Sequence, residues 1–372
     1  MTPRTIFPHT CCCPPDSKTM ETPLLAQHRA ANAHLADYRG SLLPERFSDA
    51  ATEYRAAKET VALFDTNWHA TFSLSGPDRV RYLNAIVSND IKSVGEAYGT
   101  RALLLNPQGH ILAELEVYAL AEKFLVRTHA SVRERTFATL DKFIIMDDVT
   151  LEDLTDQLGS FAVEGPQAGT VIAQACGLAL EGFSEFANAE LSIDGAPSHL
   201  IRLSHFGGTG AEIIASREHL GLLWQSMHAR VHAAHGASIG MATLNSLRLE
   251  AGIPWFPDDF NDTVIPHEAA LESTHLSFTK GCYTGQEIVE RVRSRGQVNR
   301  RRVNLKFSSA DPPSPLTRLH ANDAAAAEVG IITSSAFSPE AATAIGMAYV
   351  RREHNAPGSV LAFDGGTATV TG

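Results

Sequence analysis

Residues 280–287, with the sequence KGCYTGQE, hold the greatest density of side chains suited to chemistry. Thr284 and Glu287 have the spacing of a capping box, which predicts that a helix begins just after Thr284. Cys282 would then lie before the helix N-terminus, where the positive end of the helix dipole favours a thiolate, and Lys280 would add positive charge. The pattern predicts an accessible, reactive cysteine. A small cysteine buried in a glycine-flanked loop is the alternative.

Three glycines are expected to shape this segment. Gly281 and Gly285 leave room for a ligand or another backbone to approach closely. Gly296 is expected to end the helix, because glycine readily adopts the left-handed conformation found at helix C-termini.

Residues 291–302 form a basic island in an acidic chain whose net charge is −11. The island has no acidic residue and contains Arg291, Arg293, Arg295, Arg300, Arg301 and Arg302. Such a cluster could bind ligand carboxylates, RNA phosphates or an acidic partner. It could equally be a solvated helix face followed by an edge strand whose charges deter aggregation. It lacks the interleaved aromatic residues that are typical of a single-stranded RNA platform.

The composition is that of a globular protein with two or three domains. The chain has 372 residues, of which 44% are hydrophobic and 20% are charged. Its acidity argues against broad contact with nucleic acid or with an anionic membrane. No apolar run is long enough to predict a membrane span.

The cysteines predict a reducing compartment, because their odd number and irregular spacing do not resemble a disulfide framework. We therefore expect a cytoplasmic location, with an organellar matrix as the alternative. Adjacent cysteines rarely wrap one ion, and no metal site is expected. The cysteines are Cys11, Cys12, Cys13, Cys176 and Cys282.

Strand and helix patterns alternate without a steady βαβ rhythm, which predicts an α+β fold. Residues 1–20 are expected to be a disordered tail, and residues 22–64 to be largely helical. Residues 21–150 and 151–299 are expected to be two parts of the α+β region. Within them, strands are predicted at 71–75, 102–105, 111–120, 123–128, 160–163 and 200–204, and helices at 79–87 and 220–235. Residues 300–372 are expected to form a small β-barrel, with strands at 303–307, 330–334, 344–350 and 360–363.

The sequence KGCYTGQE resembles the signature of the YgfZ family almost letter for letter. The resemblance continues over nearly the whole chain from about Val61, because other segments are similar to blocks of the related glycine-cleavage T-protein superfamily. These segments are LFD at 63–65, SGPD at 75–78, SND at 88–90, LNPQG at 105–109, EGP at 164–166, LRLEAG at 247–252, GIITS at 330–334 and GMAYVR at 346–351.

The resemblance implies a T-protein-like, three-domain cloverleaf around a central folate cavity, ending in a small C-terminal β-barrel. It implies a tetrahydrofolate-binding protein that supports the assembly, repair or maintenance of iron–sulfur proteins, including tRNA-modifying radical enzymes. The implied partners are folate and either iron–sulfur proteins or their assembly machinery. Neither direct nucleic-acid binding nor membrane binding is expected.

The resemblance also assigns residues. Glu212, in the block GGTGAEI, is similar to the T-protein glutamate that grips the pterin, and a carboxylate can accept two N–H groups from the amide-like pterin edge. Cys282 and Lys280 are expected to carry the function of the motif. The other cofactor contacts are expected to be Arg248, Tyr283 and Gln286, with Gly281, Thr284, Gly285 and Glu287 completing the motif.

Two departures from the T-protein pattern concern the reaction. Ala113 and Glu114 stand where T-proteins have paired aspartates, and Leu244 stands where an arginine is expected. Because a transferase needs a positioned acid or base, these departures predict negligible aminomethyl transfer. Arg248 is expected either to serve the cavity or to brace Glu250. A folate-dependent aminomethyltransferase or demethylase of one-carbon metabolism is the alternative function, and an RNA-binding adaptor is a third.

Overall fold

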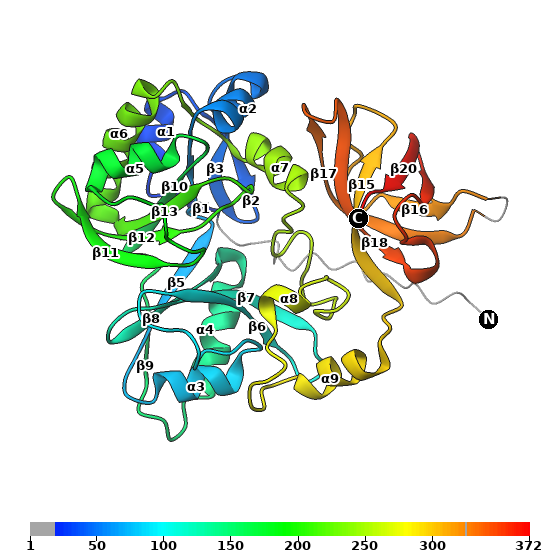
Figure 1. The fold of residues 1–372 in the computed structure, drawn as a ribbon, viewed down its shortest axis with the longest axis horizontal. Coiled ribbons are helices and arrows are strands. Elements are labelled where there is room, and N and C mark those ends of the chain that lie inside the picture. Colours follow the sequence, from blue (N-terminus) through cyan, green and yellow to red (C-terminus); the bar gives the residue numbers. More distant parts are fainter. Residues whose placement is uncertain (1–18, 324–325) are drawn as a thin grey trace.

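Two lobes of mixed sheet and helix and one barrel surround the centre of the molecule (Figure 1). The computed structural model describes residues 19–323 and 326–372. The predicted tail therefore lies outside the described residues except for Thr19 and Met20, and so do Cys11, Cys12 and Cys13. The mixture of helices with antiparallel sheets confirms the predicted α+β class.

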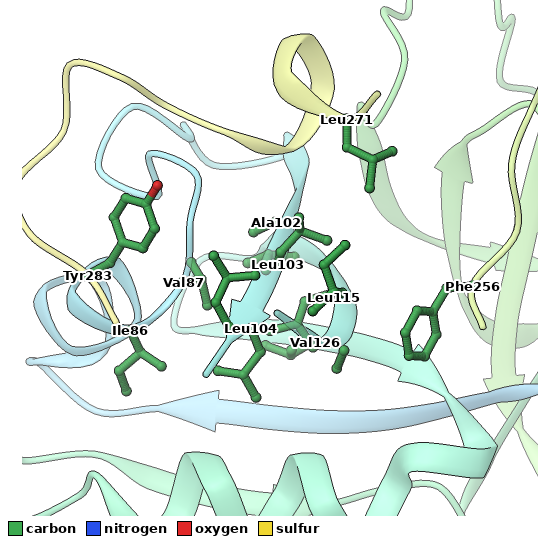
Figure 2. Close-up of a cluster of buried hydrophobic side chains, with 14 of the residues drawn as sticks. Ile86, Val87, Ala102, Leu103, Leu104, Leu115, Val126, Phe256, Leu271 and Tyr283 are labelled. Atoms are coloured by element: carbon green, nitrogen blue, oxygen red, sulfur yellow. The ribbon is translucent and has the colours of Figure 1, made fainter. Parts of the chain in front are cut away.

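The first lobe is an antiparallel sheet covered by α3 (Arg79–Ile86) and by α4 (Arg133–Lys142), which follows the short helix η1 (Ala130–Val132). Its core contains Leu104, Leu115 and Val126, which Figure 2 shows together. The four strands and the helix predicted between residues 71 and 128 are confirmed. In order across the sheet, the strands are β6 (Gly99–Leu105), β7 (Ile111–Ala119), β8 (Lys123–His129), β5 (His69–Ser75) and β9 (Thr150–Asp153).

The second lobe is a six-stranded sheet with a core on each face. Alternate residues of one strand separate the two cores: Leu63 faces one, while Ala62 and Phe64 face the other. Helices α1 (Leu25–Ala30), α5 (Ala168–Cys176) and α6 (Arg217–Ala233) belong to the first side, and α2 (Ala50–Glu59) and α7 (Met241–Glu250) to the second. The strand order is β11 (Asn188–Ile193), β12 (Ala196–Arg202), β13 (Gly210–Ser216), β10 (Leu158–Glu164), β4 (Ala62–Asp65) and β14 (Ala237–Ser238).

The two sheets interleave along the chain. Strand β4 lies in the second sheet although it precedes the whole first sheet, and β9 returns to the first sheet after residue 150. The ranges 21–150 and 151–299 therefore each contribute to both sheets. A division of the chain by sequence position does not separate the two lobes.

Residues 34–46 form a hairpin, so the prediction of a largely helical region at 22–64 is wrong there. Strand β2 (His34–Tyr38) pairs with β3 (Ser41–Arg46), which also pairs with β1 (Met20–Glu21). Arg39 and Gly40 join β2 to β3, and both have positive φ angles, as in a type I′ turn. The helical prediction holds only for α1 and α2, because an Arg-Gly turn is a weaker sequence signal than Asn-Gly.

Residues 300–370 close into a six-stranded barrel with its own core, which confirms the predicted β-barrel. Helices α8 (Glu272–His275) and α9 (Gln286–Arg295) lie in the segment before it, and η2 (Arg352–His354) lies within it. Around the barrel the strands are β15 (Arg300–Phe307), β18 (Thr343–Arg351), β17 (Glu328–Ser338), β16 (Arg318–Ala321), β19 (Val360–Phe363) and β20 (Gly366–Val370). Strand β15 pairs with β18 from Arg300 to Lys306 but with β20 only from Leu305 to Phe307, so its arginine-bearing half has one strand partner, as the edge-strand alternative expects.

Candidate functional site

A cavity of about 610 Å³ lies where the two sheets, the N-terminal hairpin and the segment before the barrel meet. This volume includes space that is open to solvent. The first sheet supplies most of the charged lining, and the hairpin and the segment at 253–256 supply much of the aromatic lining. The lining residues used below are Tyr38, Trp68, His69, Arg101, Glu114, Glu116, Arg127, His129, His205 and Trp255.

Aromatic rings form one wall of this central cavity. The ring centroids of Tyr38 and Trp255 are 6.0 Å apart, as are those of Trp68 and Trp255. The Tyr38 hydroxyl donates to Asp258 Oδ2 at 2.9 Å, which fixes the ring. Offset and edge contacts of this kind suit a flat heterocycle entering the site.

Glu212 lies behind the cavity wall rather than in it. Its side chain is fully buried, and Arg127 Nη2 donates to its Oε1 at 2.6 Å. The Thr66 hydroxyl donates to the same oxygen at 2.5 Å. Burial raises the pKa of Glu212, but the charge of Arg127 outweighs it and holds the pKa well below its usual range. The predicted pterin carboxylate is thus a charged partner of Arg127.

Several polar atoms around the central cavity have no hydrogen-bond partner although they are buried. They include Arg127 Nη1, His129 Nε2, His205 Nε2 and Glu212 Oε2. The last two lie 3.4 Å apart without adequate hydrogen-bond geometry. Because buried polar groups are normally paired, this cluster suits a ligand that presents both donors and acceptors.

Two carboxylates face the cavity from β7. Side chains alternate along a strand, so Ala113 is buried in the core while Glu114 and Glu116 line the cavity. Glu114 Oε1 lies 2.8 Å from His275 Nε2 and 3.9 Å from Arg101 Nε. The expectation that Ala113 leaves the site without an acid or base is therefore wrong.

Of the two carboxylates, Glu116 is the more deeply buried. Its Oε1 lies 3.4 Å from Arg101 Nη2, and its Oε2 accepts a 2.9 Å bond from the Tyr118 hydroxyl. Burial raises the pKa of Glu116, but Arg101 above all, with His69 and Arg127, brings it below its usual range. Glu116 is consequently a permanent negative charge, whereas Glu114 is more accessible, with its side chain 22% exposed.

His69 and His129, two histidines of the cavity, are neutral near pH 7. Burial, helped by the charge of Arg127, lowers the pKa of His69 to about 4, and burial lowers that of His129 to about 3. Arg127 Nη2 lies 2.8 Å from His69 Nδ1. The same nitrogen also lies 3.0 Å from the carbonyl oxygen of Thr66. A guanidinium can only donate and a carbonyl oxygen can only accept, so each of the two contacts requires a different tautomer of the ring.

Lys280 caps the C-terminal end of α3. Its Nζ donates to the carbonyl oxygens of Asn84, Val87 and Asn89, the last at 2.9 Å. A cation at this end satisfies carbonyls that lack helical partners and complements the helix dipole. Burial lowers the pKa of Lys280 to about 8. The hydrogen bonds of this ammonium are therefore to the end of α3, and it also lies 5.0 Å from the ring centroid of Tyr283.

Tyr283 and Gly285 anchor the motif loop to the first lobe. Tyr283 is buried in the core, near Ile86 and Val87 in Figure 2. Gly285 has φ +82°, and a Cβ there would lie 2.6 Å from Asn106 O, so the position requires glycine.

The predicted capping box does not form. Helix α9 has Gly285 as its N-cap, without a side-chain cap bond from Thr284. Glu287 instead lies 3.3 Å from Arg291 one helical turn away. The close contact of Gly285 with Asn106 imposes a left-handed residue at the start of α9, which takes the cap position. The predicted end of the helix at Gly296 is confirmed.

Cys282 is exposed on this loop, and no residue of the motif lines the central cavity. Tyr283 and Gln286 are thus not placed as cavity contacts. Cys282 remains the one side chain of the motif that combines exposure with a nucleophilic atom. Among the residues that the structure describes, no group of three His, Cys, Asp or Glu side chains could hold a metal ion.

Residues 24–276 match the GCVT N-terminal domain, and residues 300–370 match the glycine cleavage T-protein C-terminal barrel domain. The chain belongs to the glycine cleavage T-protein family. The tetrahydrofolate expected above is the cofactor of the family's aminomethyltransferases.

Similar proteins within the family are named aminomethyltransferase. The one from Saccharopolyspora erythraea is 30% identical over 352 residues, which are 94% of each chain. The one from Chlorobaculum parvum is 27% identical over 344 residues, 92% of this chain and 93% of its own.

A solved structure confirms the T-protein fold. The glycine cleavage system aminomethyltransferase T from Bartonella henselae superposes with a TM-score of 0.86 at 23% identity, covering 95% of this chain and 97% of its own. These comparisons support the T-protein part of the predicted resemblance. The narrower YgfZ assignment rests on the motif alone.

In this T-protein family member, the guanidinium of Arg248 lies over the ring of Trp255 in the cavity wall, 4.8 Å from its centroid. Arg248 is buried and forms an ion pair with Asp259, and its Nε donates to Asn245 Oδ1 at 2.9 Å. Asp259 also accepts from Thr333 and Ser334 of the barrel. Arg248 thus links α7 to the barrel through Asp259, and its role as a cofactor contact stays a prediction.

Four arginines of the basic island form ion pairs with acidic residues. Arg291 and Arg293 pair with Glu287 and Glu290, and Arg300 and Arg301 pair with Glu268 and Glu272. None of the described side chains among residues 291–302 lines the central cavity. The island is accordingly not placed to meet a ligand there.

Sequence reasoning missed most of the residues that line the central cavity. Tyr38, Arg127 and Trp255 lie far apart in the chain and carry no motif. One usable signal was available: Glu114 and Glu116 follow the Asn106–Gly109 turn with a spacing of two, which places them on the same face of a strand.

Proposed function

We propose that the central cavity binds a reduced folate, with the pterin against the aromatic wall. The observation that carries this proposal is the cluster of unpartnered buried atoms beside that wall, which includes Arg127 Nη1 and His129 Nε2. A pterin edge presents both N–H donors and a carbonyl acceptor, so it can satisfy such a mixed set. Membership of the T-protein family supports the same cofactor.

Glu212 has a defined part in this proposal. Its Oε2 is unpartnered and lies next to His205, which lines the cavity. Rotation of the His205 ring would open this oxygen to the N–H donors of the pterin. In the absence of folate, Glu212 positions Arg127, whose guanidinium reaches the cavity.

We further propose that the protein acts on the one-carbon unit of the folate, as an aminomethyltransferase or a related demethylase. The cofactor would carry the one-carbon unit. Glu114 is the accessible carboxylate of the cavity, and it would exchange a proton with the reacting amine. His275, which is buried and 2.8 Å away, holds its carboxylate in place. The names of the similar proteins support this reaction class over the expectation of negligible transfer.

Calorimetry with tetrahydrofolate tests the binding, and an assay with aminomethylated carrier protein tests the reaction. We expect saturable binding below about 1 mM, and a rise in melting temperature through linkage. Glu114→Gln should lower kcat at least about tenfold, or 1.4 kcal/mol of barrier, while Glu287→Gln leaves it unchanged. Absence of binding would refute the folate site. Binding without transfer would refute only the reaction.

A second candidate is the support of iron–sulfur proteins, including tRNA-modifying radical enzymes. Exposed Cys282 favours it, because the neighbouring motif residues Lys280, Tyr283 and Gly285 have structural contacts whereas the thiol has none that fixes the fold. The test is complementation of a deletion strain, read as the activity of iron–sulfur enzymes. Cys282→Ser should fail and Cys176→Ser should succeed. Full complementation by Cys282→Ser would remove the thiol from this function.

A further inference from the structure

A second cavity, of about 1,020 Å³, lies along the same seam between the two sheets. On β8, Arg127 faces the central cavity, while Leu125 and Lys123 face the second one. On β13, Glu212 lies behind the central cavity and Ile214 lines the second. The two cavities therefore lie in sequence along the same strands, with the Arg127–Glu212 pair between them.

The walls of the second cavity are mainly apolar. Several of its residues belong to the small core that joins the two sheets. The volume given above includes space that is open to solvent. An apolar lining of this kind is suited to a hydrocarbon chain or an aromatic ring. The apolar lining residues are Leu120, Leu125, Leu154, Leu158, Leu191 and Ile214.

His199 is the buried polar group of this cavity. It comes from β12, its exposed fraction is 6%, and neither ring nitrogen has a hydrogen-bond partner. Burial, with the charges of Arg127 and Lys123, lowers the pKa of His199 to about 4. The ring is neutral near pH 7 and offers one N–H donor to a bound group. Because an unpaired buried imidazole is costly, the site gains stability from a ligand that pairs with it.

Lys123 supplies a positive charge at the same cavity. No carboxylate within the described parts of the chain forms an ion pair with its ammonium. Glu190 also lines the cavity, on an exposed part of β11. This acid leaves the lining with little net charge, which favours a singly charged ligand over a polyanion such as the folate tail.

We propose that the second cavity binds a monocarboxylate with an apolar chain, whose carboxylate lies between Lys123 and His199 and whose chain lies among the leucines. The carboxylate accepts hydrogen bonds from both side chains, which satisfies His199 and pairs Lys123. This site is separate from the proposed folate site, and it stands whether or not the protein transfers a one-carbon unit.

Octanoate is the probe, and 1-octanol is its uncharged match. Isothermal titration of the full chain should give a Kd for octanoate below about 1 mM, at least about tenfold tighter than for 1-octanol. Lys123→Gln should weaken the binding of octanoate by about tenfold and leave the binding of 1-octanol unchanged. Lys92→Gln should change the binding of neither ligand. Leu191→Trp, which fills the second cavity, should weaken the binding of both ligands.

Equal affinity for octanoate and 1-octanol would overturn the proposal, as would unchanged octanoate binding by Lys123→Gln. The melting temperature of each variant shows whether it is folded. A second titration uses protein saturated with tetrahydrofolate. Octanoate should bind as before, because the sites are separate; competition between the two would place octanoate in the central cavity and would also overturn the proposal.

Discussion

Arg127 of β8 and Glu212 of β13 form a 2.6 Å ion pair that joins the two sheets behind the central cavity. Both side chains are almost completely buried, at 1% and 0% exposure. The pair therefore couples the folding of the two lobes to the shape of the cavity. It also separates the central cavity from the second one.

Loss of one member of this pair should be strongly destabilising. Glu212→Gln leaves Arg127 as an incompletely compensated buried charge, so the free energy of unfolding should fall by about 3–5 kcal/mol. Urea denaturation measures this free energy of unfolding. Glu287→Gln, at an exposed acid, should change it by less than about 0.5 kcal/mol. A loss below about 1 kcal/mol for Glu212→Gln would show that the pair does not hold the lobes together.

Lys280→Met should destabilise the first lobe rather than alter the thiol. The change removes three hydrogen bonds to the end of α3, so the free energy of unfolding should fall by about 1–3 kcal/mol. Lys92→Met, at an exposed lysine in the segment after α3, is the control. The rate at which iodoacetamide alkylates Cys282, followed by peptide mass spectrometry, should be the same in both variants. A slower rate in Lys280→Met alone would restore the role in activating Cys282 that the sequence suggested.

Two glycines of the motif should respond differently to alanine. Gly285→Ala places a Cβ 2.6 Å from Asn106 O at a φ of +82°, so the loop must shift. We expect a loss of at least about 1–3 kcal/mol of stability. Gly281→Ala meets no atom within 4 Å and should stay within about 0.5 kcal/mol. Equal melting temperatures for the two variants would contradict the contact with the Asn106–Gly109 turn.

Stability should decrease as the pH falls from about 6.5 towards 4. The folded pKa values of His69 and His129, about 4 and about 3, lie below the value of 6.5 expected in the unfolded chain. The unfolded state therefore binds more protons in this window, and acid favours unfolding by up to about 1.4 kcal/mol per pH unit for each histidine. Urea titrations at pH 6.5, 5.5 and 5.0 (all about ±0.1) measure how steeply the free energy of unfolding changes with pH.

Replacement of single histidines identifies the group that causes the pH dependence. His129→Gln should flatten this pH dependence by up to about 1.4 kcal/mol per pH unit, whereas replacement of His34, an exposed histidine, should leave it unchanged. An unaltered slope in His129→Gln would show that the buried imidazole is not the source.

Local patterns in the sequence determined much of the architecture. The strands of the first lobe, the barrel and the end of α9 at Gly296 follow from periodicity and turn residues, because neighbouring side chains decide them. The same patterns failed at residues 34–46, where the Arg39-Gly40 turn was not recognised. They also failed at Thr284, where a contact with Asn106, remote in the sequence, displaced the local capping signal.

The sites were decided by the tertiary structure. The motif told us where chemistry-bearing residues are concentrated, but not that Lys280 reaches the end of α3. The central cavity unites Tyr38, Arg127 and Trp255, which only the meeting of the hairpin, the first lobe and the segment before the barrel brings together. Partners across such distances leave no periodic trace in one sequence, because packing selects them by shape and charge. The sequence by itself determined the family resemblance and the elements, and tertiary packing decided which charges are buried, paired or open to a ligand.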